Sequence, residues 1–236
     1  MKEESVIAIP TYNEKGSIER LIRAIKKSHP KTRITVVDDN SPDGTAEIVE
    51  TLAHAYEGIT LISRPGKLGM ASAYITAFKA ILNDPHITRI ITMDADFSHN
   101  PDDLARLSAV MEQGNDLVVG SRYVKGGKTE NWSMRRRLLS KCANIYARMA
   151  TGIPIADLTS GFVAYHREIL ERIVEKGIMS NGYAFQIEMK FLACKYGAAA
   201  AEVPIIFSER QGGVSKFGGM MILEGLLTPW RMRFLK

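Results

Sequence analysis

The chain has 236 residues, of which 45% are hydrophobic and 24% are charged, and its formal net charge is +5. This composition excludes a disordered chain and a small disulfide scaffold, and it allows one domain with a sizeable core. The modest positive charge permits an anionic partner without identifying one.

Three sequence features bear on the cellular location. Cys142 and Cys194 lie far apart, without the spacing of a metal site, which is typical of a reducing cytosolic protein. Met1 is followed at once by charged residues and a short strand-like run, so no secretory signal is expected. No stretch reaches ~18 uncharged apolar residues, and we therefore expect no transmembrane helix.

Predicted strands and helices alternate along the chain. Apolar runs predict strands at residues 5–10, 34–37, 59–62, 90–93, 117–120 and 201–207. Helical spacing predicts helices at residues 18–27, 46–56, 70–82, 102–113 and 184–196, the fourth opened by Pro101. This alternation predicts an α/β fold, with a mostly parallel central sheet and helices on both of its faces.

Each of the first five strands is followed by charged or polar residues. These are Tyr12 and Glu14, Asp38 and Asp39, Arg64 and Lys67, Asp94 and Asp96, and Ser121 to Tyr123. In a parallel sheet, the loops after the strands gather at one edge, where ligands bind. Carboxylates beside lysine and arginine at that edge suit a phosphate-bearing ligand held with a metal ion.

The acidic pair, Asp94 and Asp96, follows the fourth strand directly. Alternate residues of an extended chain point to the same side, so both carboxylates face one spot. Two such hard oxygen ligands suit Mg²⁺ or Mn²⁺, which would bridge to the phosphates of a nucleotide. Alternatively, the pair belongs to an acidic turn or caps the next helix. The sequence has no glycine-rich dinucleotide fingerprint after its first strand and no P-loop motif.

Seven short motifs extend over nearly the whole chain. They are 10–14 (PTYNE), 37–45 (VDDNSPDGT), 93–99 (MDADFSH), 120–123 (GSRY), 157–162 (DLTSGF), 182–185 (GYAF) and 210–216 (RQGGVSK). In this order they resemble family 2 glycosyltransferases of the GT-A fold, and most of all the dolichyl-phosphate and polyprenyl-phosphate mannose synthases of the soluble catalytic type. The resemblance implies a metal-dependent, inverting transfer of mannose from GDP-mannose to dolichyl or polyprenyl phosphate.

The resemblance also implies roles for individual residues within a single domain, 1–236. In the nucleotide-binding half, 1–123, the sugar nucleotide would be held by Pro10, Tyr12, Glu14, Val37, Asp39, Asp94, Ala95 and Asp96, together with Arg210 and Lys216 from further along the chain. The metal would bind Asp94 and Asp96, and Ser98 stands where some relatives have a glutamine ligand. His99 is expected to be a structural loop residue.

The acceptor side is expected in residues 124–216. By resemblance, Arg122, Arg136 and Ser140 would bind the phosphate of the lipid acceptor, since the planar guanidinium group matches phosphate oxygens. The alternative for the arginines at 135–137 is a solvated helix face.

The tail, 217–236, mixes apolar residues with Trp230, Arg231, Arg233 and Lys236. An amphipathic helix of this kind either lies in a membrane interface or packs on the core of the protein. A lipid acceptor favours the membrane, and we therefore expect a peripheral protein on the cytoplasmic face, with a possible membrane-anchoring partner protein and no nucleic acid.

Three other functions remain open from the sequence. The nearest is a UDP-glucose-dependent enzyme that acts on the same lipid. A nucleotidyltransferase would usually have a glycine-rich loop after its first strand, where this chain has residues 10–14. A non-catalytic nucleotide-binding module would not need the arginine-rich acceptor half.

Overall fold

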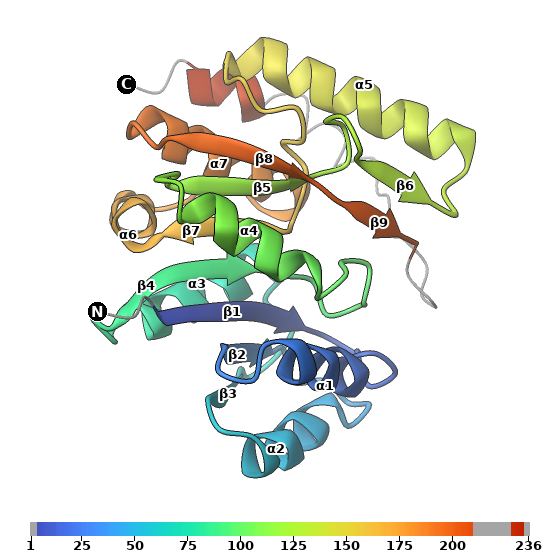
Figure 1. Ribbon diagram of the computed structural model, residues 1–236, viewed down its shortest axis with the longest axis vertical. Coiled ribbons are helices and arrows are strands. Elements are labelled where there is room, and N and C mark those ends of the chain that lie inside the picture. The colour runs from blue at the N-terminus through green and yellow to red at the C-terminus, as the bar shows by residue number, and fades with distance from the viewer. Residues whose placement is uncertain (1–3, 210–227, 234–236) are drawn as a thin grey trace.

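The computed structural model of the protein describes residues 4–209 and 228–233. Its strands are β1 (Glu4–Thr11), β2 (Arg33–Asp38), β3 (Ile59–Ser63), β4 (Ile87–Thr92), β5 (Leu117–Ser121), β6 (Lys128–Glu130), β7 (Val163–His166), β8 (Ala200–Pro204) and β9 (Ile206–Ser208). Its helices are α1 (Ile18–Ser28), α2 (Thr45–Ala55), α3 (Met70–Ile81), α4 (Asp103–Met111), α5 (Met134–Thr151), α6 (Arg167–Lys176) and α7 (Gly182–Lys195) (Figure 1).

The centre of the fold is a seven-stranded sheet in the order β3-β2-β1-β4-β7-β5-β8. The pairs β3–β2, β2–β1, β1–β4 and β5–β8 are parallel, and β7 runs antiparallel between β4 and β5. The predicted α/β fold with a mostly parallel sheet is confirmed. The sheet takes strands from both 1–123 and 124–216, whereas the division of the domain at those residues stays a prediction.

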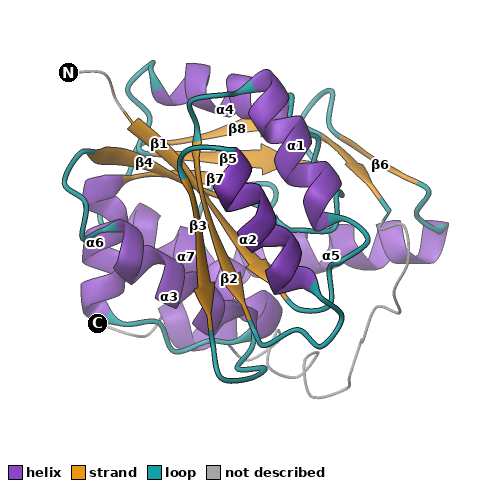
Figure 2. Ribbon diagram, turned by 90° about the horizontal axis from the view of Figure 1, so that it is seen from below, coloured by secondary structure: helices purple, strands orange, loops and turns teal. Residues whose placement is uncertain are grey.

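Side chains of the central strands alternate between two hydrophobic clusters, one on each face of the sheet. Along β1, Val6 and Ala8 belong to the cluster under α3, α6 and α7. Ile7 and Ile9 belong to the cluster under α1, α2 and α4. This period of two is the geometry of a strand buried on both faces, and it explains why the strand sequences are continuously apolar. Figure 2 shows the helices on the two sides of the sheet.

Two parts of the second half differ from the sequence-based prediction. We expected residues 201–207 to form one strand, but β8 joins the main sheet and β9 pairs with β6 in a separate two-stranded sheet. The split has a simple reason, because β8 pairs with β5 only as far as Ser121, where β5 ends. Strands β6 and β7, helix α6 and the bounds of helix α5 were not predicted; β7 has only four residues, too few to show a clear period.

Among the described residues, no helix is long and apolar enough to cross a membrane. Residues 228–233 of the expected tail are helical, with Met232 buried and Trp230 exposed. Residues 217–227 and 234–236 of that tail lie outside the described part of the chain, as do Arg210 and Lys216.

Candidate active site

The loops after β1, β2 and β4 lie at one edge of the sheet, as the sequence predicted. Each contains a residue other than glycine in the left-handed backbone region: Asn13 (φ 60°), Asn40 (φ 57°) and Phe97 (φ 62°). Asparagine tolerates this conformation, but for a bulky residue such as Phe97 it costs free energy and persists only where the surroundings impose it. Strain of this kind is common at functional sites, so this edge of the sheet is a candidate functional site.

The acidic pair stands at the end of β4. The backbone N–H of Met93 still donates to the carbonyl of Ala8 on β1 (3.1 Å), and Asp94 and Asp96 follow it, each partly exposed. Although part of Asp94 is exposed, the protein around it shields the carboxylate from water, and this desolvation, followed by the nearby charges of Asp96 and Glu14, raises its pKa above the ordinary value. Carboxylates from the β1 and β4 loops therefore repel one another here, and a cation at this place would relieve the repulsion.

Gly161 lies directly against Asp94. A Cβ atom at Gly161 would lie 3.2 Å from both carboxylate oxygens of Asp94, so a larger residue would press on this carboxylate. The turn at 157–161, which leads into β7 beside β4, thus reaches the acidic pair at the same edge of the sheet. Thr92 supports this approach, because its hydroxyl donates to the carbonyl of Gly161 (2.8 Å).

The residues around the acidic pair fit a hard divalent cation. The backbone N–H of Ser98 donates to Asp96 Oδ1 (3.0 Å), while its buried Oγ has no hydrogen-bond partner among the described residues. In the same part of the chain, no three His, Cys, Asp or Glu side chains are grouped as a metal site. Two carboxylates with an excess of negative charge suit Mg²⁺ or Mn²⁺, since Mg²⁺ in particular keeps several water ligands and needs few protein ones.

His99 is a buried neutral side chain beside the pair. Burial lowers its pKa to about 4, so its Nδ1, 4.0 Å from Asp94 Oδ2, carries no charge at neutral pH. The ring stacks on Phe162 with 5.0 Å between ring centroids. This packing agrees with the structural role expected for His99.

Asp39, which the sequence predicts to bind the nucleotide, is fully engaged by protein donors. Its Oδ1 accepts from Nε of Arg64 (2.6 Å) and pairs with Nη2 of the same guanidinium group, and its Oδ2 accepts from the backbone N–H groups of Leu68 (3.1 Å) and Gly69 (3.2 Å). Four donors fill the acceptor positions of a carboxylate. In this conformation Asp39 holds the loop after β3 in place and has no capacity left for the edge of a base.

The other predicted nucleotide residues have different surroundings. Tyr12 carries the ammonium group of Lys67 over its ring, 4.0 Å from the centroid, which brings the β1 and β3 loops together. Glu14 accepts from the Ser17 hydroxyl (3.0 Å). Val37 is fully buried in the core, so its side chain packs under the site, and Pro10, at the end of β1, pairs with it in the sheet. Ala95 is buried between the two acidic residues.

Arg122, which the sequence predicts to bind the acceptor phosphate, is held by Asp157. Nε and Nη2 of Arg122 donate to the two Asp157 oxygens at 2.7 Å each, and the backbone N–H of Arg122 donates to Oδ2 at 3.0 Å. The two side chains are 7% and 0% exposed. The Arg122 guanidinium group also lies between the rings of Tyr123, Trp132 and Phe207, 5.3–5.5 Å from each centroid.

The remaining acceptor candidates lie on α5, which Ser133 caps by accepting from the backbone N–H of Arg136. Ser140 accepts from the Tyr123 hydroxyl (2.6 Å), so it lies close to the end of β5. Arg136 stacks on Trp132, 4.1 Å from the ring centroid, and pairs with Glu209 (2.6 Å). The structure therefore brings Arg122, Arg136 and Ser140 to one region. The rings of Tyr123, Trp132 and Phe207 lie beside it.

Three buried polar residues that were not predicted as site residues hold this region together. Asp157 binds Arg122. The side chain of Asn144 accepts from the backbone N–H groups of Leu158 (2.7 Å) and Thr159 (3.2 Å), which ties α5 to the 157–161 turn. Lys190 on α7 is fully buried and donates to the carbonyl of Ser160 (2.7 Å). The sequence feature that could have identified Lys190 is a charged residue inside a mostly apolar helix sequence.

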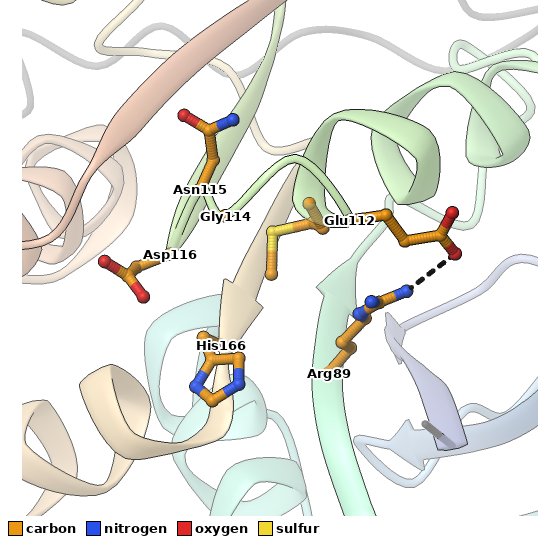
Figure 3. A pocket seen from close by; sticks show the side chains of 7 residues that line it. Arg89, Glu112, Gly114, Asn115, Asp116 and His166 are labelled. Carbon is orange, nitrogen blue, oxygen red and sulfur yellow. Dashed lines mark hydrogen bonds and ion pairs between the residues drawn. The ribbon is translucent and has the colours of Figure 1, made fainter. Parts of the chain in front are cut away.

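A separate polar hollow of about 290 Å³ lies at the opposite edge of the sheet, around the start of β4 and of β5. Figure 3 shows Arg89, Glu112, Asp116 and His166 around it, and Arg89 pairs with Glu112 (3.2 Å). Asp116 accepts from the backbone N–H of Ala199 (2.9 Å). These bonds join neighbouring elements of the fold, and the hollow lies away from the acidic pair.

Comparison with known proteins identifies the family of the chain. Residues 6–174 match the sequence profile of the family described as Glycosyl transferase family 2. The chain is 40% identical over 234 residues to a protein named polyprenol monophosphomannose synthase from Mycolicibacterium smegmatis, covering 98% of this chain and 88% of the relative. It is 37% identical over 223 residues to an undecaprenyl-phosphate mannosyltransferase from Micrococcus luteus, covering 94% and 91%.

Solved structures show the same fold at lower sequence identity. A glucosyl-3-phosphoglycerate synthase from Mycobacterium tuberculosis, crystallised with Mn²⁺, UDP and phosphoglyceric acid, superimposes with a TM-score of 0.74 at 18% identity. The match covers 100% of this chain and 80% of that one, and a crystal of the same synthase with Mg²⁺ and UDP gives the same TM-score. From the family profile and the two relatives together, the chain belongs to glycosyl transferase family 2 and is a glycosyltransferase with the GT-A fold.

Proposed function

We propose that this glycosyltransferase transfers mannose from GDP-mannose to a polyprenyl phosphate, with Mg²⁺ or Mn²⁺ bound at the acidic pair. The observation that carries the proposal is the similarity over almost the full chain to two relatives, both named as mannosyltransferases of polyprenyl phosphates. The geometry supports it, because the acidic pair and the predicted acceptor residues are joined by one short turn, 157–161.

The reaction requires little help from a protein base. A phosphate monoester has its second pKa near ~6, so the acceptor is already an anion at neutral pH. One of its oxygens attacks the anomeric carbon and forms the new C–O bond, while the bond from that carbon to the diphosphate oxygen breaks and the nucleoside diphosphate leaves with the electron pair. Attack from the face opposite the leaving group inverts the configuration. The chain therefore has to align the two substrates and stabilise the leaving charge.

The metal would be held by Asp94 and Asp96, with the orphaned hydroxyl of Ser98 as a third candidate. When bound, it supplies Lewis-acid stabilisation of the diphosphate leaving group. Arg210 and Lys216 are proposed to neutralise diphosphate oxygens, and they lie outside the described residues.

The nucleotide would be held by the loops after β1 and β2 and by the 64–69 loop. Tyr12 and Glu14 come from the first of these loops, and Pro10, Val37 and Ala95 would shape the floor of the site. Because its four acceptor positions are filled, Asp39 is proposed to act through the 64–69 loop rather than by direct contact with the base.

The acceptor phosphate would bind near Arg122, Arg136 and Ser140. Arg122 is bound to Asp157 through Nε and Nη2, so we propose that it contributes charge and anchors the 157–161 turn, while Arg136 and Ser140 contact the phosphate. A lipid acceptor implies work at a membrane surface, on its cytoplasmic face if the lipid is loaded there. A membrane-anchoring partner protein remains part of this proposal.

The test is a transfer assay with a crossed set of substrates. GDP-mannose and UDP-glucose are each incubated with the protein and a polyprenyl phosphate, with Mg²⁺, Mn²⁺ or a chelator, and the lipid extract is analysed by mass spectrometry. We expect a mannosylated lipid phosphate from GDP-mannose that disappears with chelator. A glucosylated lipid would establish the UDP-glucose alternative, and full activity with chelator would refute the metal assignment.

A further inference from the structure

Helix α5 faces its apolar side outward. Leu138 is 65% exposed and Met149 is 71% exposed, although leucine and methionine are usually inside a protein. The exposed stripe, which we call the apolar stripe, consists of Met134, Leu138, Cys142, Ile145 and Met149. Their spacing, i, i+4, i+8, i+11 and i+15, places all of them on one face of the helix.

The opposite face of α5 is the one that touches the protein, and it is mostly polar or small. Its residues are Arg136, Ser140, Asn144, Ala147 and Thr151, which have the same spacing as the stripe and are buried or half-buried. Three of them bind other parts of the site: Ser140 binds Tyr123, Asn144 binds the 157–161 turn and Arg136 binds Glu209. Within the described part of the chain, the apolar stripe is therefore not the side by which α5 packs on its own fold.

The charges around the stripe indicate the kind of partner. Arg135, Arg137, Lys141 and Arg148 are exposed on α5, and the helix contains no aspartate or glutamate. An apolar stripe with cations beside it suits a surface that is apolar inside and anionic outside, as a bilayer with acidic headgroups is. A second copy of the chain is a poorer partner, because a two-fold contact would bring these cations against the same cations.

The described part of the C-terminal segment extends the same side of the molecule. Nη1 of Arg233 donates to the carbonyl of Met149 (3.3 Å), which fixes residues 228–233 beside the end of α5. Trp230, 44% exposed, and Arg231 come from that segment. Figure 1 shows this short red helix next to the yellow end of α5, along one outer side of the molecule.

We propose that α5 docks lengthwise on an anionic lipid bilayer, with the apolar stripe inserted at the headgroup level. This inference deepens the proposed function and rests on it, because transfer to a lipid phosphate requires a membrane surface near the acceptor site. The predicted acceptor-phosphate residues Arg136 and Ser140 lie on the inner side of the same helix. A docked α5 would bring the headgroup region of the bilayer to that inner side.

The first test uses Cys142, which lies in the stripe. In the full chain with Cys194→Ser, Cys142 is labelled with a polarity-sensitive fluorophore and mixed with vesicles of phosphatidylcholine alone or with phosphatidylglycerol. We expect a blue shift with the anionic vesicles, weakened by salt because the cations are exposed, and little shift with the neutral ones. An unshifted label on vesicles that do co-sediment the protein would overturn the docking face.

The second test changes the stripe itself. Leu138→Glu with Met149→Glu should lower partition onto anionic vesicles by about tenfold or more, since both apolar side chains would be lost from the interface. The matched control is Met179→Glu, because Met179 is 68% exposed and lies outside α5. An equal loss in the control would overturn the assignment to α5. Circular dichroism checks folding, and unfolding of the stripe variant alone would show that the stripe is structural.

A third variant tests the charges without touching the apolar residues. Arg137→Gln with Lys141→Gln should weaken binding to anionic vesicles and leave the weak binding to neutral ones unchanged. If the wild type is a dimer in solution that Leu138→Glu dissociates, with no vesicle binding, the stripe is a protein interface and the lipid proposal is wrong.

Failure of this proposal and failure of the proposed function are distinguishable. A stripe variant that loses vesicle binding but still glycosylates a short, water-soluble polyprenyl phosphate supports both. Vesicle binding without transfer to any lipid phosphate would refute the proposed function and leave the docking surface in place.

Discussion

The buried pair of Arg122 and Asp157 gives the sharpest prediction, because its two roles can be separated by measurement. Arg122→Met removes a guanidinium group that makes two hydrogen bonds of 2.7 Å to a carboxylate with no exposed surface. What then remains for Asp157 is the backbone N–H of residue 122 (3.0 Å) and the longer bond from the Thr159 hydroxyl (3.3 Å). A buried carboxylate would be left without its cation.

The expected cost follows from that geometry. Removing one partner of a buried ion pair destabilises a protein by roughly 3–5 kcal/mol, most of it from the charge left behind. For a chain of this size, a loss of 1 kcal/mol shifts the melting temperature by roughly 2–4 °C, so Tm should fall by about 6–20 °C. Arg122→Met with Asp157→Asn should lose less than the sum of the single changes, because no buried charge is then stranded.

At acid pH, the difference in the free energy of unfolding between the wild type and Arg122→Met should become smaller. Burial alone would raise the pKa of Asp157, but Arg122 and its hydrogen bonds hold it below the ordinary value. A lowered carboxyl pKa contributes stability that is complete above the unfolded-state pKa, ~3.9, and is lost as the pH falls through the lowered value. Urea unfolding of the wild type and of Arg122→Met at pH 7 and at pH 3 measures the difference in their free energies of unfolding at each pH.

One result would refute this reasoning. If Arg122→Met melts like the wild type at pH 7 and loses only its response to acceptor concentration, the arginine is an acceptor-binding residue and the pair is not structural. Arg122→Lys is the matched control, since it keeps the charge and loses the two-pronged geometry.

Three further predictions concern the rest of the site. Asp96→Asn should lower Mn²⁺-dependent turnover by orders of magnitude with an unchanged Tm, and calorimetry should show the loss of metal binding. Unchanged turnover would place the metal elsewhere. Gly161→Ala should lower kcat on the order of tenfold without unfolding the protein, because its Cβ would press on Asp94 from 3.2 Å; wild-type kinetics would show that this contact is unimportant. Burial lowers the pKa of Lys190 to about 7, so between about pH 7 and pH 10 the unfolded chain binds more protons than the folded one. The free energy of unfolding, relative to that of Lys190→Met, should therefore rise with pH by at most about 1.4 kcal/mol per pH unit. A difference between the two proteins that does not change with pH would contradict the lowered pKa.

The sequence alone determined the architecture of the first half and the edge that carries the site. Continuous apolar strands alternate with amphipathic helices there, and both signals are local, with periods that can be read within one window. The same reasoning placed Asp94 and Asp96 at the end of a buried strand. Strand β7 escaped it, because an antiparallel strand of four residues between β4 and β5 is specified by its neighbours rather than by its own pattern.

Only the tertiary structure decided how the site residues are paired and which way α5 faces. Asp39 was expected at a base edge, but Arg64 and the backbone of the 64–69 loop fill its acceptors, and Arg122 finds Asp157, 35 positions along the chain. The pattern of α5 shows two faces and does not say which is inside. Burial of the polar face depends on Tyr123, Glu209 and the 157–161 turn, which are distant in sequence, and such non-local contacts leave no trace in the periodicity of the helix.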